Sequence, residues 1–110
     1  MANKNANEDY ILYIMNKLDD RTVLEQLAEE AAELSQACLK LIRARGLSNN
    51  VTPIDQEKAL RNLYEEMSDV AMCYFMLFGG CHTHASESVI RLSKWKRWAK
   101  RLGYFKEGES

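Results

Sequence analysis

The chain has 110 residues, of which 46% are hydrophobic and 28% are charged, with only five glycines and one proline. These values are typical of one globular domain spanning residues 1–110, and they exclude an architecture built from many turns. The net charge is −1, yet residues 91–106 carry seven bases and no acid. This asymmetry favours an anionic ligand and, with a pI of about 6.1, argues against binding to a nucleic acid polymer.

Four helices are predicted and no segment shows the alternation of a strand. In chain order they cover about residues 7–18, 19–44, 52–78 and 86–102. Asp19 or Asp20 can cap the second helix, and Ser86 can cap the fourth. Thr52 followed by Pro53 suits the start of the third helix, because proline fits the first helical position.

Glycines predict where the helices end. Gly46 follows the second helix and Gly103 follows the fourth, and Gly79-Gly80 interrupts the third. Residues 46–52 read as a loop. The sequence therefore predicts an all-α, four-helix bundle with two long central helices.

The two central helices carry apolar stripes at helical spacing. The stripes are Leu24, Leu27, Ala31, Leu34, Cys38 and Leu41 on the second helix, and Leu60, Leu63, Tyr64, Met67, Ala71, Tyr74 and Phe78 on the third. Four helices of this size make a thin core, and the third helix is apolar on more than one face. We therefore expect self-association as a homodimer or homotetramer.

Two acidic clusters are the most informative feature of the sequence. Residues 29–33 read Glu-Glu-Ala-Ala-Glu, and residues 65–69 read Glu-Glu-Met-Ser-Asp. Glu30 and Glu33 lie three residues apart, as do Glu66 and Asp69, so a helix places each pair on one face. The residues four positions after Glu30 and Glu66 are apolar rather than basic, so neither acid is placed to form an ion pair within its own helix.

Both clusters border an apolar stripe, where an uncompensated charge is costly. If the second and third helices pack together, the four carboxylates converge on one groove and need a cation between them. A hard divalent cation is the usual solution, so we expect Mg²⁺, with Mn²⁺ as the alternative. The competing interpretation is a solvated acidic surface, which is common on helices.

The segments Leu27-Ala-Glu-Glu-Ala-Ala-Glu-Leu34 and Leu63-Tyr-Glu-Glu-Met-Ser-Asp-Val70 resemble the MazG-like nucleotide pyrophosphohydrolase family. The resemblance covers most of residues 20–102. It implies an oligomeric all-α fold that binds Mg²⁺ and cleaves a nucleoside triphosphate between the α and β phosphates, giving a monophosphate and pyrophosphate. The segment between the two acidic pairs is longer than in many compact members, and residues 43–59 are expected to form an extra turn or flap.

This resemblance assigns metal binding to Glu30, Glu33, Glu66 and Asp69. Glu29 and Glu65 are the candidates for orienting the attacking water. On the fourth helix, Lys94, Arg97 and Arg101 share one flank, and Lys94 and Arg97 are the candidates for holding substrate phosphates. The competing interpretation of that flank is a solvated basic face whose stems cover the core.

Several alternatives remain open at this stage. The same carboxylates would serve a phosphoribosyl-ATP pyrophosphohydrolase or a dUTPase-like enzyme, and a catalytically silent helical interaction protein is a different class of function. A di-iron bundle is less favoured because it expects Glu-x-x-His motifs. The run Cys81-His82-x-His84 has no distant partner for a closed zinc site. Tyr10 and Tyr13 could stack on a nucleobase, although ordinary packing is more common.

The location is expected to be cytoplasmic. The three cysteines form no C-x-x-C pair, which fits a reducing compartment. The polar N-terminus lacks the apolar segment of a signal peptide. The longest apolar run, residues 70–81, is shorter than a membrane span, so no membrane partner is expected.

Overall fold

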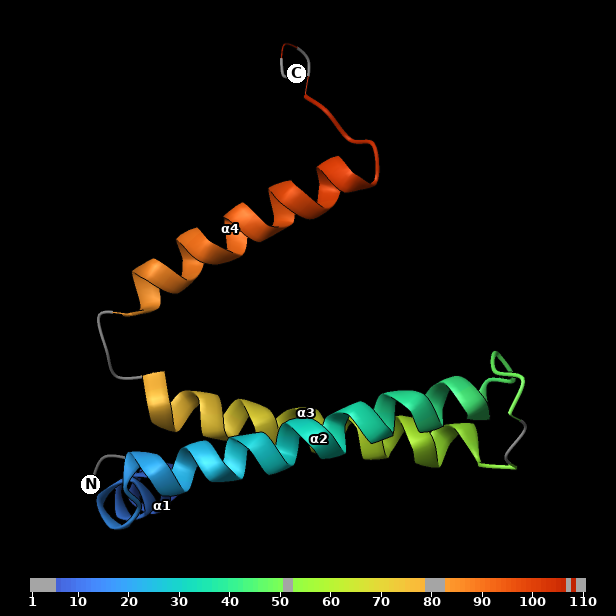
Figure 1. Ribbon diagram of the computed structural model, residues 1–110. Coiled ribbons are helices and arrows are strands. Elements are labelled where there is room, and N and C mark those ends of the chain that lie inside the picture. Colours follow the sequence, from blue (N-terminus) through green and yellow to red (C-terminus); the bar gives the residue numbers. More distant parts are fainter. Residues whose placement is uncertain (1–5, 51–52, 79–82, 107, 109–110) are drawn as a thin grey trace. The chain divides into compact units, whose positions relative to one another are not determined.

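The computed structural model describes residues 6–50, 53–78, 83–106 and 108. Its helices are α1 (Ala6–Lys17), α2 (Asp20–Ala44), α3 (Gln56–Phe78) and α4 (Thr83–Arg101), and these ranges contain no strand (Figure 1). The prediction of an all-α chain with four helices is therefore confirmed. Gly79-Gly80, Cys81 and His82 lie outside the described residues.

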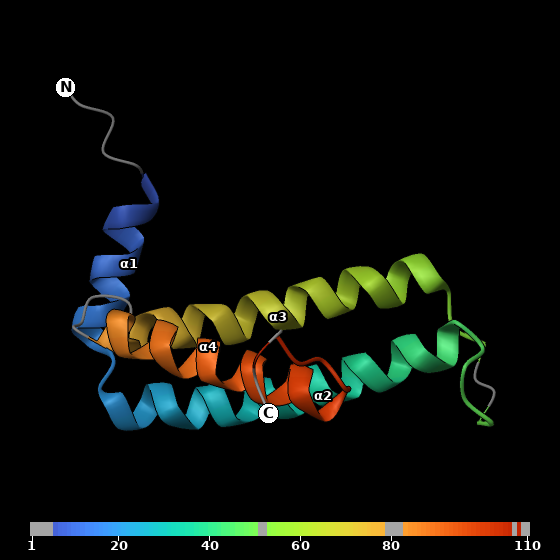
Figure 2. The ribbon, with the colours of Figure 1, turned by 90° about the horizontal axis from the view of Figure 1, so that it is seen from above.

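The chain divides into two compact units, Met1–Leu77 and Phe78–Ser110. In the first unit, α2 and α3 run side by side in opposite directions (Figures 1 and 2). α1 lies against α3, because Ile11 and Ile14 line the same apolar hollow as Met72 and Phe75. The second unit consists mainly of α4.

Local capping explains where α2 begins and ends. Asp19 takes the extended conformation of a cap, and its Oδ1 accepts a 2.8 Å hydrogen bond from the N–H of Thr22. At the other end Gly46 has a φ of 70°, which L side chains rarely adopt. Its N–H donates to the carbonyl of Arg43, and the next N–H donates to the carbonyl of Ile42. These two hydrogen bonds form a Schellman motif, which ends α2 at the predicted place before Gly46.

The predicted start of α3 at Thr52–Pro53 is wrong. The helix begins at Gln56, and Asp55 Oδ1 accepts a 3.0 Å hydrogen bond from the N–H of Glu57. An aspartate side chain can satisfy a free N–H in the first turn, whereas Pro53 offers only a favourable φ. Pro53 therefore lies in the connection, and Thr52 is outside the described residues.

α4 ends as predicted but begins earlier. Gly103 has a φ of 97°, and its N–H donates to the carbonyl of Lys100, while the N–H of Tyr104 donates to that of Ala99. These bonds form a second Schellman motif after Arg101. The start is at Thr83 rather than after a cap at Ser86.

The buried seam between α2 and α3 differs from the predicted stripes. The buried residues of the described segments are Val23, Ala37, Leu41, Ala59 and Cys73. Leu41 belongs to a predicted stripe, but Leu24 is 52% exposed, Tyr64 is 64% exposed and Cys38 is exposed. The stripes are wrong at these positions and at Met67, Tyr74 and Phe78, which are also exposed. The line along which the helices meet is displaced around each helix from part of its predicted stripe.

No helix in the described part of the chain combines the length and the apolar character that a membrane crossing requires.

Replacing Asp19 by alanine should lower the melting temperature, because the N–H of Thr22 would lose its acceptor. This hydrogen bond also lowers the pKa of Asp19 below its ordinary value of 3.8. The bond therefore stabilises the fold above pH 3.8, and this stabilisation fades as the pH falls below 3.8. Thermal unfolding followed by circular dichroism at pH 7 and pH 2.5 measures both effects. Asp20→Ala is the matched control, and an equal loss in both variants would contradict the capping role.

Candidate functional site

The seam between α2 and α3 contains a layer of carboxylates between two apolar layers. Along each helix the residues of these three layers are seven positions apart. They are Val23, Glu30 and Ala37 on α2, and Ala59, Glu66 and Cys73 on α3. A spacing of seven keeps side chains facing a partner helix, and in an antiparallel pair the two series run in opposite directions. Glu30 and Glu66 thus occupy positions that an ordinary helical hairpin gives to apolar residues.

Carboxylate oxygens of Glu30, Glu66 and Asp69 lie within 4.8 Å of one another, and all three residues are partly buried. Glu33 is more exposed, but its carboxyl lies within hydrogen-bonding reach of Glu66. The structure therefore brings together the four acids that the sequence singles out. We call these four residues the carboxylate cluster.

Gln26 orients one member of the carboxylate cluster. Its Nε2 donates a 2.6 Å hydrogen bond to Oε1 of Glu30, one helical turn away. The second oxygen of Glu30, Oε2, is closed off from solvent and has no hydrogen-bond partner, and Oε2 of Glu66 is in the same condition. Buried oxygens that carry negative charge and lack a partner are costly, so both atoms require a proton or a cation.

The electrostatics of the cluster agree with that requirement. Burial raises the pKa of Glu66 above its ordinary value of 4.5, and the neighbouring carboxyls of Glu33, Asp69 and Glu30 raise it further. Burial and the charges of Glu30 and Asp69 also raise the pKa of the Cys73 thiol. Cys73 therefore stays protonated at neutral pH and packs as a small apolar side chain beneath the carboxylates.

The donor set fits a hard divalent cation. It consists of carboxylate oxygens from two facing helices, and two of those oxygens lack any other partner. Mg²⁺ and Mn²⁺ prefer oxygen ligands, and one or two carboxylates with water complete the usual magnesium coordination. The cluster could hold such an ion through Glu30, Glu66 and Asp69, with Glu33 at its edge.

The other predicted site residues are not members of the carboxylate cluster. Glu29 is exposed on α2, and Glu65 is exposed on α3, where it lines a neighbouring pocket. Lys94 and Arg97 belong to the second unit, where they line a shallow hollow on α4 with Trp98 and Arg101. The rings of Trp95 and Trp98 stack there, with centroids 5.8 Å apart and planes within 4°.

The tyrosines of α1 are placed for solvent and local contacts. Tyr10 is 70% exposed, and the ammonium group of Lys17 lies 5.5 Å from the ring centre of Tyr13. That distance is within the range of a cation–π interaction, which occupies one face of the ring.

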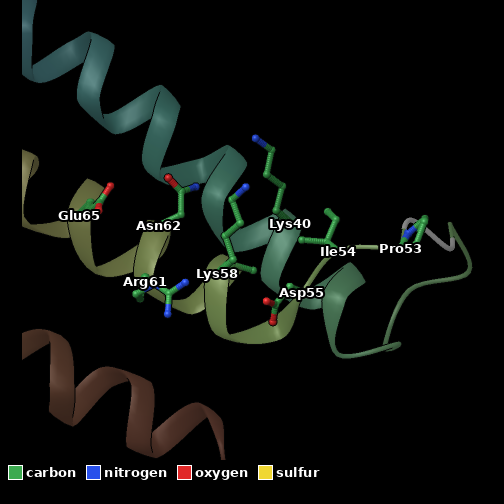
Figure 3. A pocket seen from close by; sticks show the side chains of 9 residues that line it. Lys40, Pro53, Ile54, Asp55, Lys58, Arg61, Asn62 and Glu65 are labelled. Atoms are coloured by element: carbon green, nitrogen blue, oxygen red, sulfur yellow. The ribbon is translucent and has the colours of Figure 1, made fainter.

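A pocket of about 720 Å³ lies between α2, α3 and the connection that joins them (Figure 3). Its charged and amide residues are Lys40, Asp55, Lys58, Arg61, Asn62 and Glu65. The ends of Lys40, Lys58, Asn62 and Glu65 point the same way, whereas Arg61 and Asp55 point to the other side (Figure 3). The sequence alone did not point to a role for either lysine. The spacing is the signal that could have found them, because Lys40 follows Glu33 by seven residues and Lys58 precedes Glu65 by seven.

Comparison of the chain with protein-family models, with curated proteins and with solved structures gave no match.

Glu66→Gln should raise the melting temperature at pH 7 in the presence of a chelator. Because the pKa of Glu66 is higher in the folded state than in the unfolded state, ionising this residue destabilises the fold. The destabilisation is absent below about pH 4.5 and grows as the pH rises through the folded-state pKa. The gain from the neutral amide should therefore shrink on acidification. Thermal unfolding between pH 4 and 8 measures it.

Glu29→Gln is the matched control, because this exposed glutamate lies outside the cluster. A Glu66→Gln protein no more stable than the native chain at pH 7 would show that the carboxylates do not strain the seam.

Proposed function

We propose that this chain is a Mg²⁺-dependent nucleoside triphosphate pyrophosphohydrolase of the MazG-like type, which releases a nucleoside monophosphate and pyrophosphate. The observation that carries the proposal is the carboxylate cluster, with two solvent-inaccessible oxygens that lack partners in the middle of a helical hairpin. A solvated acidic surface, the competing interpretation, does not bury charge in this way.

The chemistry of the reaction matches this arrangement. Cleavage of a phosphoanhydride by water requires neutralisation of charge on the phosphate oxygens and an oriented nucleophile. Mg²⁺ held by Glu30, Glu33, Glu66 and Asp69 would supply the first and would acidify a water molecule. Gln26 keeps Glu30 turned towards the cluster through its hydrogen bond.

Of the two acids considered for orienting the water, Glu65 has the better position. It precedes Glu66 on α3 and faces the pocket, whereas Glu29 is exposed on α2 and lines no described pocket (Figure 3). A carboxylate in this place can accept a hydrogen bond from a water molecule and hold it beside the substrate. Lys94 and Arg97 on α4 stay the residues that the sequence predicts for phosphate contact.

Self-association is part of the proposal. Only five apolar residues are buried within the described segments, and the exposed apolar residues include Met67, Met72, Phe75 and Ile90. Because the first unit buries so few apolar residues, covering its exposed apolar surface would raise its free energy of unfolding. A homodimer or homotetramer would supply that cover, and the biological role would be the removal of non-standard or surplus nucleotides.

Purified protein with Mg²⁺ should release pyrophosphate from at least one nucleotide in a broad panel. Glu66→Ala should lower the rate by about 100-fold or more while helix content stays intact, because the ion loses a ligand at its centre. A coupled pyrophosphate assay and circular dichroism measure the two quantities. Glu57→Gln, an exposed glutamate in the first turn of α3, serves as the control. Full turnover by Glu66→Ala would rule out the assignment.

Calorimetry should detect Mg²⁺ or Mn²⁺ binding in the micromolar to millimolar range, and Glu30→Gln should abolish it. This result separates an enzyme from a catalytically silent helical interaction protein, for which we expect no binding. The panel should include dUTP and phosphoribosyl-ATP, because the same cluster would serve those two activities.

A further inference from the structure

The pocket beside the carboxylate cluster is lined by two lysines, one from each of the two helices. Lys40 comes from α2 and Lys58 from α3, and their ammonium groups point the same way (Figure 3). Among the residues that the structure describes, neither lysine has a carboxylate within ion-pair distance, although Asp55 and Glu65 also line the pocket. Two unpaired cations on one side of a hollow favour an anion between them.

Sequence spacing relates the pocket to the carboxylate cluster along both helices. Lys40 follows Glu33 by seven residues, which is two turns along the same flank of α2. Asn62 precedes Asp69 by seven residues on the corresponding flank of α3. From Lys58 to Glu66 the helix rises about 12 Å, and the long stem of a lysine covers part of that distance. One extended anionic ligand can therefore reach both places.

The lining of the pocket indicates which part of a nucleotide it suits. None of its lining residues is aromatic, so the pocket offers no ring on which a base could stack. Two ammonium groups and the amide of Asn62 are instead suited to phosphate oxygens. Its volume of about 720 Å³ falls within the range of small-molecule sites.

We propose that Lys40, Lys58 and Asn62 bind the terminal phosphates of the substrate's polyphosphate chain and make the enzyme select nucleoside triphosphates over diphosphates. The inference rests on the proposed pyrophosphohydrolase activity and adds a determinant of substrate class to it. The α and β phosphates meet the ion at the carboxylate cluster, and the γ phosphate lies towards the lysines. A diphosphate leaves the two lysines without an anion and loses their contribution to binding.

The test uses two measurements on the full chain. The first is calorimetric binding of inorganic tripolyphosphate in the presence of a chelator, which does not depend on turnover. Lys40→Gln and Lys58→Gln should each weaken binding by about tenfold, as expected for the loss of one charged hydrogen bond. Lys58→Arg should retain binding. Arg61→Gln removes the same charge from the same helix, but its guanidinium points away from both lysines, so it should leave the affinity unchanged (Figure 3).

The second measurement is the ratio of kcat/KM for a nucleoside triphosphate to that for the corresponding diphosphate. We expect this ratio to fall by about tenfold in each Lys→Gln variant and to stay at the native value in Arg61→Gln. Unchanged tripolyphosphate affinity and an unchanged ratio in both lysine variants would overturn the pocket assignment and leave the hydrolase proposal standing. Lysine-dependent tripolyphosphate binding by a protein that hydrolyses no nucleotide would overturn the hydrolase proposal, and with it the selection of triphosphates.

Discussion

Repulsion between carboxylates in the α2–α3 seam is the constraint on which the structure depends. Helical hairpins normally fill such seam positions with apolar side chains, and here Glu30 and Glu66 occupy them. The layers on either side are small or modest in size and include Ala37, Ala59 and Cys73. The hairpin thus gives up packing energy at its centre, which is a cost that a purely structural helix pair would not bear.

The charges along the hairpin are separated rather than paired. Carboxylates gather at the centre of the seam, whereas Lys40 and Lys58 line the pocket near the connecting loop together with Asp55 and Glu65. An ion pair of Arg21 with Glu25 lies on the exposed surface of α2. A fold under selection for stability alone would let these opposite charges neutralise one another. Their separation suits a ligand that carries a cation at one end and anionic oxygens at the other, as a magnesium polyphosphate does.

The thin core has a consequence beyond the site. The apolar hollow between α1 and α3, lined by Ile11, Ile14 and Phe75 among others, remains open in the first unit. Stacked Trp95 and Trp98 leave more than half of their surface exposed in the second. This open apolar surface on both units is what the proposed self-association would cover. The carboxylate cluster itself draws its side chains from a single hairpin.

The sequence by itself determined the helical character, the stops at Gly46 and Gly103, and the identity of the four acids, because capping chemistry and three-residue spacing are local properties. It did not determine which line of each helix became the seam. Leu24 and Tyr64 stayed exposed because they lie off the line along which α2 and α3 pack. Only the tertiary structure decided that one oxygen of Glu30 and one of Glu66 are closed off from solvent, and that Lys40 and Lys58 line one pocket. Both outcomes depend on the antiparallel register of α2 and α3, which no local spacing specifies.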